Sequence, residues 1–282
     1  MSLDQQVHII PGYKCNMFCR HCGVGASPDN KKRVSDKETN QIIADINIHN
    51  PKRIHFTGGE PTLYLDVVNY ILKNTKRIKG VYVSITTNGL FIRDRTMSDL
   101  LGKFYKLNHV QLSYDSHHKP KLSHQEIRKI AHYCVRNSIS FNISVAISEP
   151  QEIKLAKEIS NKTGCDVLCE KVVDCGRAHD NKLSFEYPLF DSDVLNQKCP
   201  NLHQICYHPG KGYSICCSNL AFNKDLPYLF HKEIQDHLNS EFYNRIKQRT
   251  FGELLNESNI KITQLGPADS QPCNLCERIF SS

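Results

Sequence analysis

The sequence contains no long hydrophobic run. Its 282 residues include no stretch of about 18 consecutive apolar side chains, the length that a helix needs to cross a bilayer. The first six residues also lack the basic and then apolar pattern of a secretory signal. We therefore expect a cytoplasmic protein without a membrane partner.

Positive charge is in modest excess and is not concentrated in one place. The net charge of +7 is spread over short clusters at 31–33, at 76–77 and at Lys119 with Lys121. No cluster is interleaved with aromatic side chains, so a nucleic-acid partner is not expected. Solvated surface explains each cluster, and the excess is also compatible with an anionic substrate or an acidic peptide.

Cysteine, in contrast, is abundant, with 13 residues. Because the cytosol keeps thiols reduced, metal or redox chemistry explains them better than disulfides. Cys15, Cys19 and Cys22 have the spacing C-x3-C-x2-C directly after a short apolar stretch. Three thiolates can hold three irons of a cubane cluster and leave the fourth iron open, whereas electron-transfer clusters usually have four cysteines. A zinc site with His21 as fourth ligand is the alternative from the triplet alone.

From residue 5 to about 172, the pattern alternates between strand and helix. Strands are predicted at 7–10, 53–57, 81–87, 110–114, 140–147 and from 166. Capping boxes at Ser35 with Glu38 and at Ser123 with Glu126 open two of the helices, and others are predicted at 65–76, at 93–104 and from Pro150. Six β-α pairs predict an α/β fold, an open and partial (β/α)6 barrel of TIM type, with the site at the C-terminal ends of the strands.

After residue 180 prolines, glycines and cysteines break this rhythm. We expect a different architecture there, with one domain at 1–180 and a small cysteine-rich domain at 181–282. Within the second domain, 199–219 is interpreted as a hairpin-like module and 231–249 as an amphipathic helix. The tail ends in Cys273-x2-Cys276.

A glycine pair with a carboxylate follows the second predicted strand, in Gly58-Gly59-Glu60-Pro61. Adjacent glycines let a ligand approach the backbone, and a carboxylate can accept hydrogen bonds from an ammonium group. Together with the cysteine triplet, with His21 before its last cysteine, this motif resembles the radical S-adenosylmethionine (radical SAM) superfamily. Two further strand ends, Thr87-Asn88-Gly89 and Ser113-Tyr114-Asp115, fit the same family.

The resemblance implies both cofactors and mechanism. Cys15, Cys19 and Cys22 would hold a [4Fe–4S] cluster whose open iron binds SAM. The backbone at Gly58 and Gly59, with Glu60, would receive the SAM amine, and the ribose and carboxylate would lie near Asn88, Ser113 and Asn142 or Ser144. A 5′-deoxyadenosyl radical would then abstract a substrate hydrogen. An external electron donor of flavodoxin or ferredoxin type is implied as partner.

The C-terminal cysteines resemble the SPASM and twitch domains of this superfamily, and Gly176-Arg177-Ala178 resembles the junction before them. The resemblance implies one auxiliary [4Fe–4S] cluster on Cys199, Cys216, Cys273 and Cys276. A structural zinc site is the alternative, and Cys217 could replace Cys216. Cys206 is either a hydrogen-atom donor or a buried thiol, and Cys134, Cys165 and Cys169 are expected in the core.

Family analogy leaves the substrate open. The favoured hypothesis is modification of a ribosomally synthesised precursor peptide by cross-linking, thioether or ether formation, or epimerisation. The alternatives are oxidation or epimerisation of a small polar metabolite such as an aminocyclitol or sugar, and a non-catalytic iron–sulfur or zinc protein.

Overall fold

The computed structural model describes residues 6–94, 96–118 and 120–281. Its centre is one eight-stranded sheet in the order β6-β5-β4-β3-β2-β1-β7-β8. The strands are β1 (Gln6–Ile9), β2 (Arg53–Phe56), β3 (Tyr82–Thr87), β4 (His109–Ser113), β5 (Ser140–Ile147), β6 (Val167–Lys171), β7 (Gln204–His208) and β8 (Gly212–Ser214). All neighbours pair in parallel except β7 and β8, which are antiparallel. The predicted six-stranded partial barrel is therefore confirmed.

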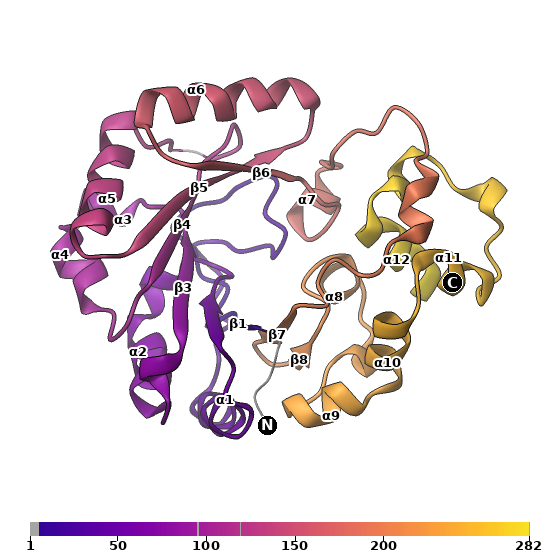
Figure 1. The fold of residues 1–282 in the computed structure, drawn as a ribbon, viewed down its shortest axis with the longest axis horizontal. Helices are drawn as coiled ribbons and strands as arrows, with labels where there is room; N and C mark the ends of the chain where they lie inside the picture. Colours follow the sequence, from indigo (N-terminus) through magenta and orange to yellow (C-terminus); the bar gives the residue numbers. More distant parts are fainter. Residues whose placement is uncertain (1–5, 95, 119, 282) are drawn as a thin grey trace.

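Helices cover the outer face of this curved sheet (Figure 1). They are α1 (Asp36–His49), α2 (Leu65–Asn74), α5 (His124–Arg136) and α6 (Ile153–Thr163). Both predicted capping boxes are present, since Ser35 and Ser123 each exchange hydrogen bonds with the glutamate three residues on. Buried aliphatic side chains of the helices and strands form one hydrophobic core between the two layers.

Two predicted helices were wrong in extent. Instead of one helix over 93–104, the chain forms α3 (Phe91–Asp94), α4 (Met97–Leu100) and a 3-10 turn. The hydroxyl of Thr96 accepts a hydrogen bond from the Asp99 amide, which starts a new helix. In the same way the hydroxyl of Ser240 caps Tyr243 and divides the predicted helix over 231–249 into α9 (Ile234–Asn239) and α10 (Glu241–Gln248).

The C-terminal region combines a hairpin with a helical cluster. The predicted hairpin is present as β7 and β8, and β7 pairs in parallel with β1, so the hairpin continues the sheet. A second hydrophobic core joins α10, α11 (Phe251–Asn256) and α12 (Pro272–Phe280). Figure 1 shows this cluster beside the open edge of the barrel, with the short α7 (Arg177–Asp180) and α8 (Asn219–Asn223) between them. The division at residue 180 stays a prediction.

The burial of the three cysteines expected in the core differs. Cys134 is buried, Cys165 is partly buried and Cys169 is exposed. The prediction for Cys169 was wrong because β6 is an edge strand whose residues face solvent. Within the described residues, no helix is long and apolar enough to span a membrane. Lys119, part of one predicted basic cluster, lies outside the described residues.

Candidate functional site

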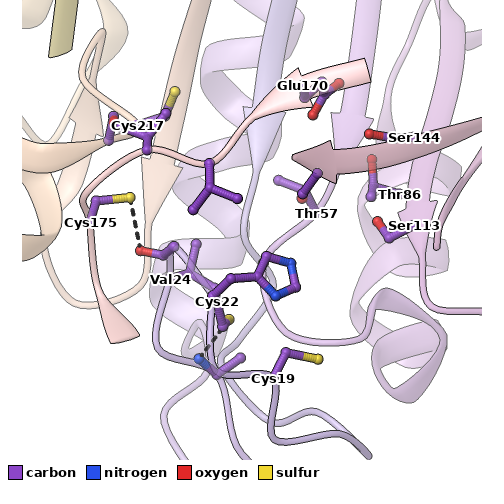
Figure 2. Close-up of a pocket in the computed structure, with 18 of the residues that line it drawn as sticks. Cys19, Cys22, Val24, Thr57, Thr86, Ser113, Ser144, Glu170, Cys175 and Cys217 are labelled. Atoms are coloured by element: carbon purple, nitrogen blue, oxygen red, sulfur yellow. Dashed lines mark hydrogen bonds between the residues drawn. The ribbon is translucent and has the colours of Figure 1, made fainter. Parts of the chain in front are cut away.

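A cavity of about 480 Å³ lies at the C-terminal ends of the barrel strands. The cysteine triplet, the glycine pair and residues from the ends of five strands, β2 to β6, line it on one side, and residues of the C-terminal region line the other (Figure 2). Of the predicted site residues, it brings together Cys15, Cys19, His21, Cys22, Gly58, Gly59, Glu60, Asn88, Ser113, Asp115, Ser144 and Cys273. Pro61 and Asn142 are not among its lining residues.

The three cysteines lie on one irregular loop after β1, and each is partly buried. Backbone hydrogen bonds of Cys15 to Ser27 and of Cys22 to Cys19 fold the loop, and the Cys22 sulfur accepts a hydrogen bond from the Ala26 amide. Burial raises the pKa of Cys15 to about 11 and that of Cys19 to about 12, and neighbouring acidic groups add to the rise. Without a metal these thiols are protonated at neutral pH, so a cation that binds them must displace protons.

The donor set of the loop suits a cubane with one open iron. The loop offers three cysteine thiols, and a cubane takes each thiolate on a different iron. A zinc ion needs four ligands around one point. His21, the candidate for the fourth ligand, instead lies 3.3 Å from Asp115 and forms with Asp115 and His118 the group that, among the described residues, could share an ion.

The glycine pair holds this loop against the end of β2. Gly59 donates a hydrogen bond to the Gly12 carbonyl, and Glu60 donates one to the Lys14 carbonyl. A Cβ atom on Gly59 would lie 2.1 Å from the Lys14 oxygen, and Gly58 has a φ of +111°. The pair is therefore required for packing of the cysteine loop, in addition to any ligand contact.

Glu60 is almost fully buried and its carboxylate already has protein partners. One oxygen accepts hydrogen bonds from the amide and hydroxyl of Thr62 and from the hydroxyl of Thr87, and the other accepts from the Asn88 amide at 2.9 Å. Burial raises the pKa of Glu60, although these donors oppose the rise. The carboxylate thus ties the end of β2 to the end of β3.

Asn88, after β3, faces the cysteine loop. Its side-chain amide donates to Asn16 at 2.7 Å and lies 3.5 Å from the Cys15 sulfur. Ser113 and Ser144 sit opposite each other in the register of β4 and β5, and both line the cavity. Sequence reasoning missed Thr57, Thr86 and Glu170, which also line it, as Figure 2 shows. Their positions at the ends of predicted strands were the available signal.

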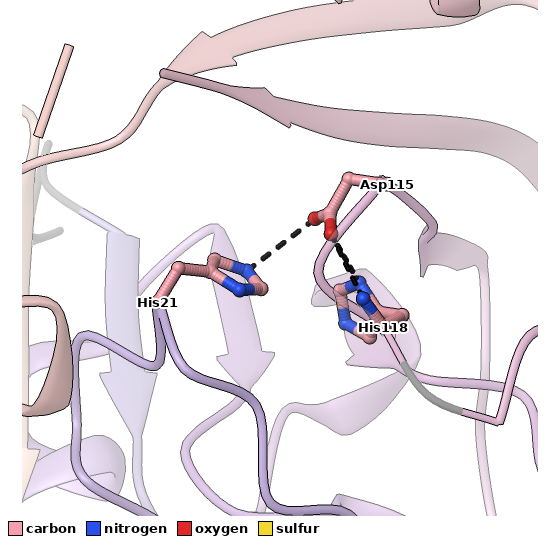
Figure 3. A group of neighbouring side chains, drawn as sticks. All are labelled: His21, Asp115 and His118. Carbon is pink, nitrogen blue, oxygen red and sulfur yellow. Dashed lines mark hydrogen bonds and ion pairs between the residues drawn. The ribbon is translucent and has the colours of Figure 1, made fainter. Parts of the chain in front are cut away.

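His21, Asp115 and His118 form a buried group at the edge of the cavity (Figure 3). Asp115 lies 3.3 Å from His21 Nε2 and 2.9 Å from His118 Nδ1. Burial alone would raise the pKa of Asp115, but the hydrogen bonds from His118 and His21 hold it well below its usual range. The anionic carboxylate therefore fixes the orientation of the ring of His21, a residue that lies between Cys19 and Cys22 in the sequence.

Arg177 clamps the cysteine loop from the other side. Its guanidinium donates to the carbonyls of Cys19 at 2.8 Å, Gly25 at 3.0 Å and Ala26 at 2.6 Å. Gly176 has a φ of +55°, and a Cβ atom there would lie 2.3 Å from the Gly23 oxygen. The Gly-Arg-Ala junction thus packs directly on the loop and holds its carbonyls.

A second, narrow pocket is lined by all four cysteines predicted for an auxiliary site, namely Cys199, Cys216, Cys273 and Cys276. Burial raises the pKa of each, to about 12 for Cys199 and Cys216. Cys217 instead lines the first cavity, where Gln204 donates to its sulfur at 2.8 Å. Cys206 is buried on β7 and lines a neighbouring cavity inside the barrel.

The superfamily model for radical SAM proteins matches residues 9–147. This stretch of the chain is a radical SAM domain. It contains the cysteine triplet, the glycine pair and the ends of β1 to β5. SAM and a [4Fe–4S] cluster are the cofactors of such a domain, and the loop described above fits a cluster by its donor set, three cysteine thiols that line one cavity.

Two curated relatives give different activities. A GTP 3′,8-cyclase of Limosilactobacillus fermentum is 38% identical over 98 residues, which are 32% of this chain and 28% of that protein. An Fe-coproporphyrin III synthase of Methanosarcina barkeri is 24% identical over 237 residues, 79% of this chain and 57% of that protein. The chain therefore spans less than two thirds of either relative.

Solved structures extend the likeness beyond the radical SAM domain. The structure of anSMEcpe with bound AdoMet and Cp18Cys peptide has a TM-score of 0.56 at 14% identity, covering 98% of this chain and 95% of that one. BtrN in complex with AdoMet and 2-DOIA has a TM-score of 0.52 at 14% identity, covering 90% and 91%. At these identities the likeness concerns the fold, including the region after residue 180.

Proposed function

We propose that the chain is a radical SAM enzyme. Cys15, Cys19 and Cys22 hold a [4Fe–4S] cluster, and SAM lies in the adjoining cavity against Gly58, Gly59, Asn88, Ser113 and Ser144. When bound and reduced, the cluster supplies the electron that splits SAM and yields the radical that abstracts a hydrogen atom. One observation carries the proposal: a single cavity is lined by the thiols, the glycine pair and the polar ends of β2 to β5.

Each protein group has a role in this proposal. Glu60 is a positioning residue, because its oxygens are taken up by Thr62, Thr87 and Asn88. Asp115 orients His21 toward the cavity. The buried strand ends exclude water from the bound nucleoside, which protects a reactive radical from side reactions.

A second cavity, which we call the substrate chamber, adjoins this one. A space of about 570 Å³ continues into the barrel and shares Val24, Thr57, Thr86, Glu170 and Cys217 with the first cavity. Closed TIM barrels fill this interior with branched apolar side chains. Here the lining is polar and includes His8, His55, His109 and Gln111.

Burial disfavours the charged form of three of the chamber histidines. It lowers the pKa of His8 to about 4, and it also lowers the pKa of His55 and of His109. Neutral imidazoles and hydroxyls suit a hydrogen-bonding substrate group more than a strongly anionic one. A volume in this range accommodates a peptide side chain or a small molecule.

Modification of a ribosomally synthesised peptide is the favoured activity. The chamber adjoins the site cavity and shares lining residues with it, and anSMEcpe, whose fold is similar, is described with a bound peptide. The second candidate is oxidation or epimerisation of a small polar metabolite. The polar chamber lining and the likeness to BtrN, described with 2-DOIA, favour it.

We also propose one auxiliary [4Fe–4S] cluster on Cys199, Cys216, Cys273 and Cys276. The four thiols line one pocket, and four cysteine thiolates are the usual ligand set of a cubane. A zinc ion on the same four thiols is the alternative, and metal analysis distinguishes the two.

The decisive experiment is anaerobic reconstitution followed by measurement of 5′-deoxyadenosine under dithionite. We expect the wild-type protein to be brown and to cleave SAM, and the Cys15, Cys19 and Cys22 triple alanine variant to form no 5′-deoxyadenosine. A colourless zinc protein without SAM cleavage would contradict the proposal. Co-expression with a short peptide encoded beside the gene then tests the substrate, through a change of mass or stereochemistry.

A further inference from the structure

The loop that carries the cysteine triplet is also part of the molecular surface. Along it, exposed side chains alternate with half-buried or buried ones. The outward residues are Lys14, Asn16, Phe18 and Arg20, and the inward residues are Cys15, Met17 and Cys19. The outward residues are therefore next neighbours in the chain of the cysteines proposed to hold the cluster.

Phe18 is a large apolar side chain that remains 64% exposed. The guanidinium of Arg177 lies 3.7 Å from the centre of its ring, and the same group donates to the Cys19 carbonyl. Aromatic and arginine side chains together are enriched at the centres of protein interfaces. Phe18 is therefore suited to anchor a partner directly over the cysteine loop.

A surface cavity of about 440 Å³ adjoins this aromatic side chain. Phe18, Val24, Arg177 and Phe222 contribute to its lining, together with one carboxylate, Asp180. An exposed ring beside a hollow gives a shape that a protruding loop of a partner can fill.

The charge of this loop is strongly one-sided. Between residues 14 and 33 there are five cationic side chains and one carboxylate, namely Lys14, Arg20, Lys31, Lys32 and Arg33 against Asp29. Lys14 and Arg20 are both exposed, and in the sequence one precedes Phe18 and the other follows it. Complementary charge accelerates encounter with a partner and fixes its orientation.

We propose that the surface formed by Lys14, Phe18, Arg20 and Arg177 docks a small acidic one-electron carrier protein of the flavodoxin type. This inference rests on the proposed function, since a cluster that splits SAM must first receive one electron. The carrier's anionic flavin hydroquinone loses one electron and becomes the neutral semiquinone. The cluster gains that electron, and no proton is transferred.

The test compares two reductants on the same reconstituted protein. A Lys14→Glu, Arg20→Glu double variant is matched with a Lys73→Glu, Lys129→Glu variant, whose changed residues are exposed on the outer helices α2 and α5. The rate of 5′-deoxyadenosine formation is measured with dithionite and with flavodoxin hydroquinone, at low and at high salt.

With flavodoxin at low salt, we expect a decrease of at least about tenfold for the Lys14, Arg20 variant alone, because steering by charge changes association by this order. With dithionite, both variants are expected to match wild type. An unchanged flavodoxin rate in the Lys14, Arg20 variant would overturn the proposal.

If dithionite turnover also falls, the loop itself has been damaged, and the wild-type protein decides. Its flavodoxin rate must then decrease as salt rises while its dithionite rate stays constant; equal salt responses would refute the docking surface. Failure of the proposed function looks different, because wild-type protein would form no 5′-deoxyadenosine with either reductant.

Discussion

At the scale of single residues, the site depends on glycines as much as on cysteines. Gly59 lets the cysteine loop lie against the end of β2, with backbone hydrogen bonds on both sides. Glu60 then joins that strand to β3 through Thr87 and Asn88. The Gly-Gly-Glu motif therefore fixes where the thiols stand before any ligand binds.

Replacing Gly59 by alanine tests this role. Because the new Cβ atom would meet the Lys14 oxygen at 2.1 Å, the loop must move, and we expect most of the bound iron and the cluster absorbance near 420 nm to be lost. Gly80→Ala is the control, since nothing lies within 4 Å of a Cβ atom there. Full iron content in the Gly59 variant would show that the loop tolerates the shift.

At the scale of elements, a capping box and an ion pair together fix the start of helix α5. Helix α5 begins with a box of Ser123 and Glu126, and the same glutamate binds the Arg93 guanidinium at 2.8 Å. Hydrogen bonds from Arg93 and Ser123 lower the pKa of Glu126 from its ordinary value of 4.5 to about 2. A carboxyl group whose pKa is lower in the folded state stabilises the fold above pH 4.5, and this contribution is lost as the pH falls toward 2.

Glu126→Gln should therefore destabilise the protein by about 1 kcal/mol at pH 7, the usual effect of one cap and one surface pair. The difference from wild type should shrink at pH 3, because Glu126 of the unfolded wild-type chain then binds a proton while that of the folded chain stays mostly ionised, which favours unfolding. Urea unfolding of both proteins at the two pH values measures this. A difference that grows toward low pH would contradict the assigned pKa.

At the scale of the whole molecule, the sequence predicted the barrel because its signals are local. Period-2 strands and the Ser35 and Ser123 caps depend on neighbours in the chain, and the structure reproduces them. The breaks at Thr96 and Ser240 were missed because a hydroxyl inside an apolar helical pattern can either face solvent or restart the helix. The exposure of Cys169 follows from strand order, which single-strand patterns do not encode.

Predicted site residues from the motifs, except Pro61, line one cavity, whereas Asn142 does not line it. It occupies the same face of β5 as Ser144 but two residues before it, farther from the strand end. Motif spacing places a residue on a strand, but the depth at which the cavity ends depends on packing across the sheet. For the same reason the ends of predicted strands indicate Thr57, Thr86 and Glu170 only as candidates, and the assembled barrel shows that they line the cavity.

The two cysteine sites are connected through the C-terminal region. Gly176 donates to the Asn223 side chain at 2.9 Å, and Asn223 donates to Glu277 at 3.1 Å, one residue after Cys276 on α12. Arg177 meanwhile holds the loop of Cys19. The helix that carries two of the proposed auxiliary ligands is thus hydrogen-bonded to the segment that clamps the first cluster loop.

Replacing Cys273 and Cys276 by alanine separates the tasks of the two sites. Because Arg177 holds the first cysteine loop through the backbone carbonyls of that loop, we expect the variant to keep the first cluster and cleave SAM, to lose the iron of one cubane, and to release no modified substrate. Iron analysis, 5′-deoxyadenosine formation and product mass measure the three effects. Cys169→Ala, at an exposed position on β6, should leave all three unchanged. If the double variant modified its substrate at the wild-type rate, the auxiliary site would have only a structural task, and electron acceptance from the substrate radical would have to occur elsewhere.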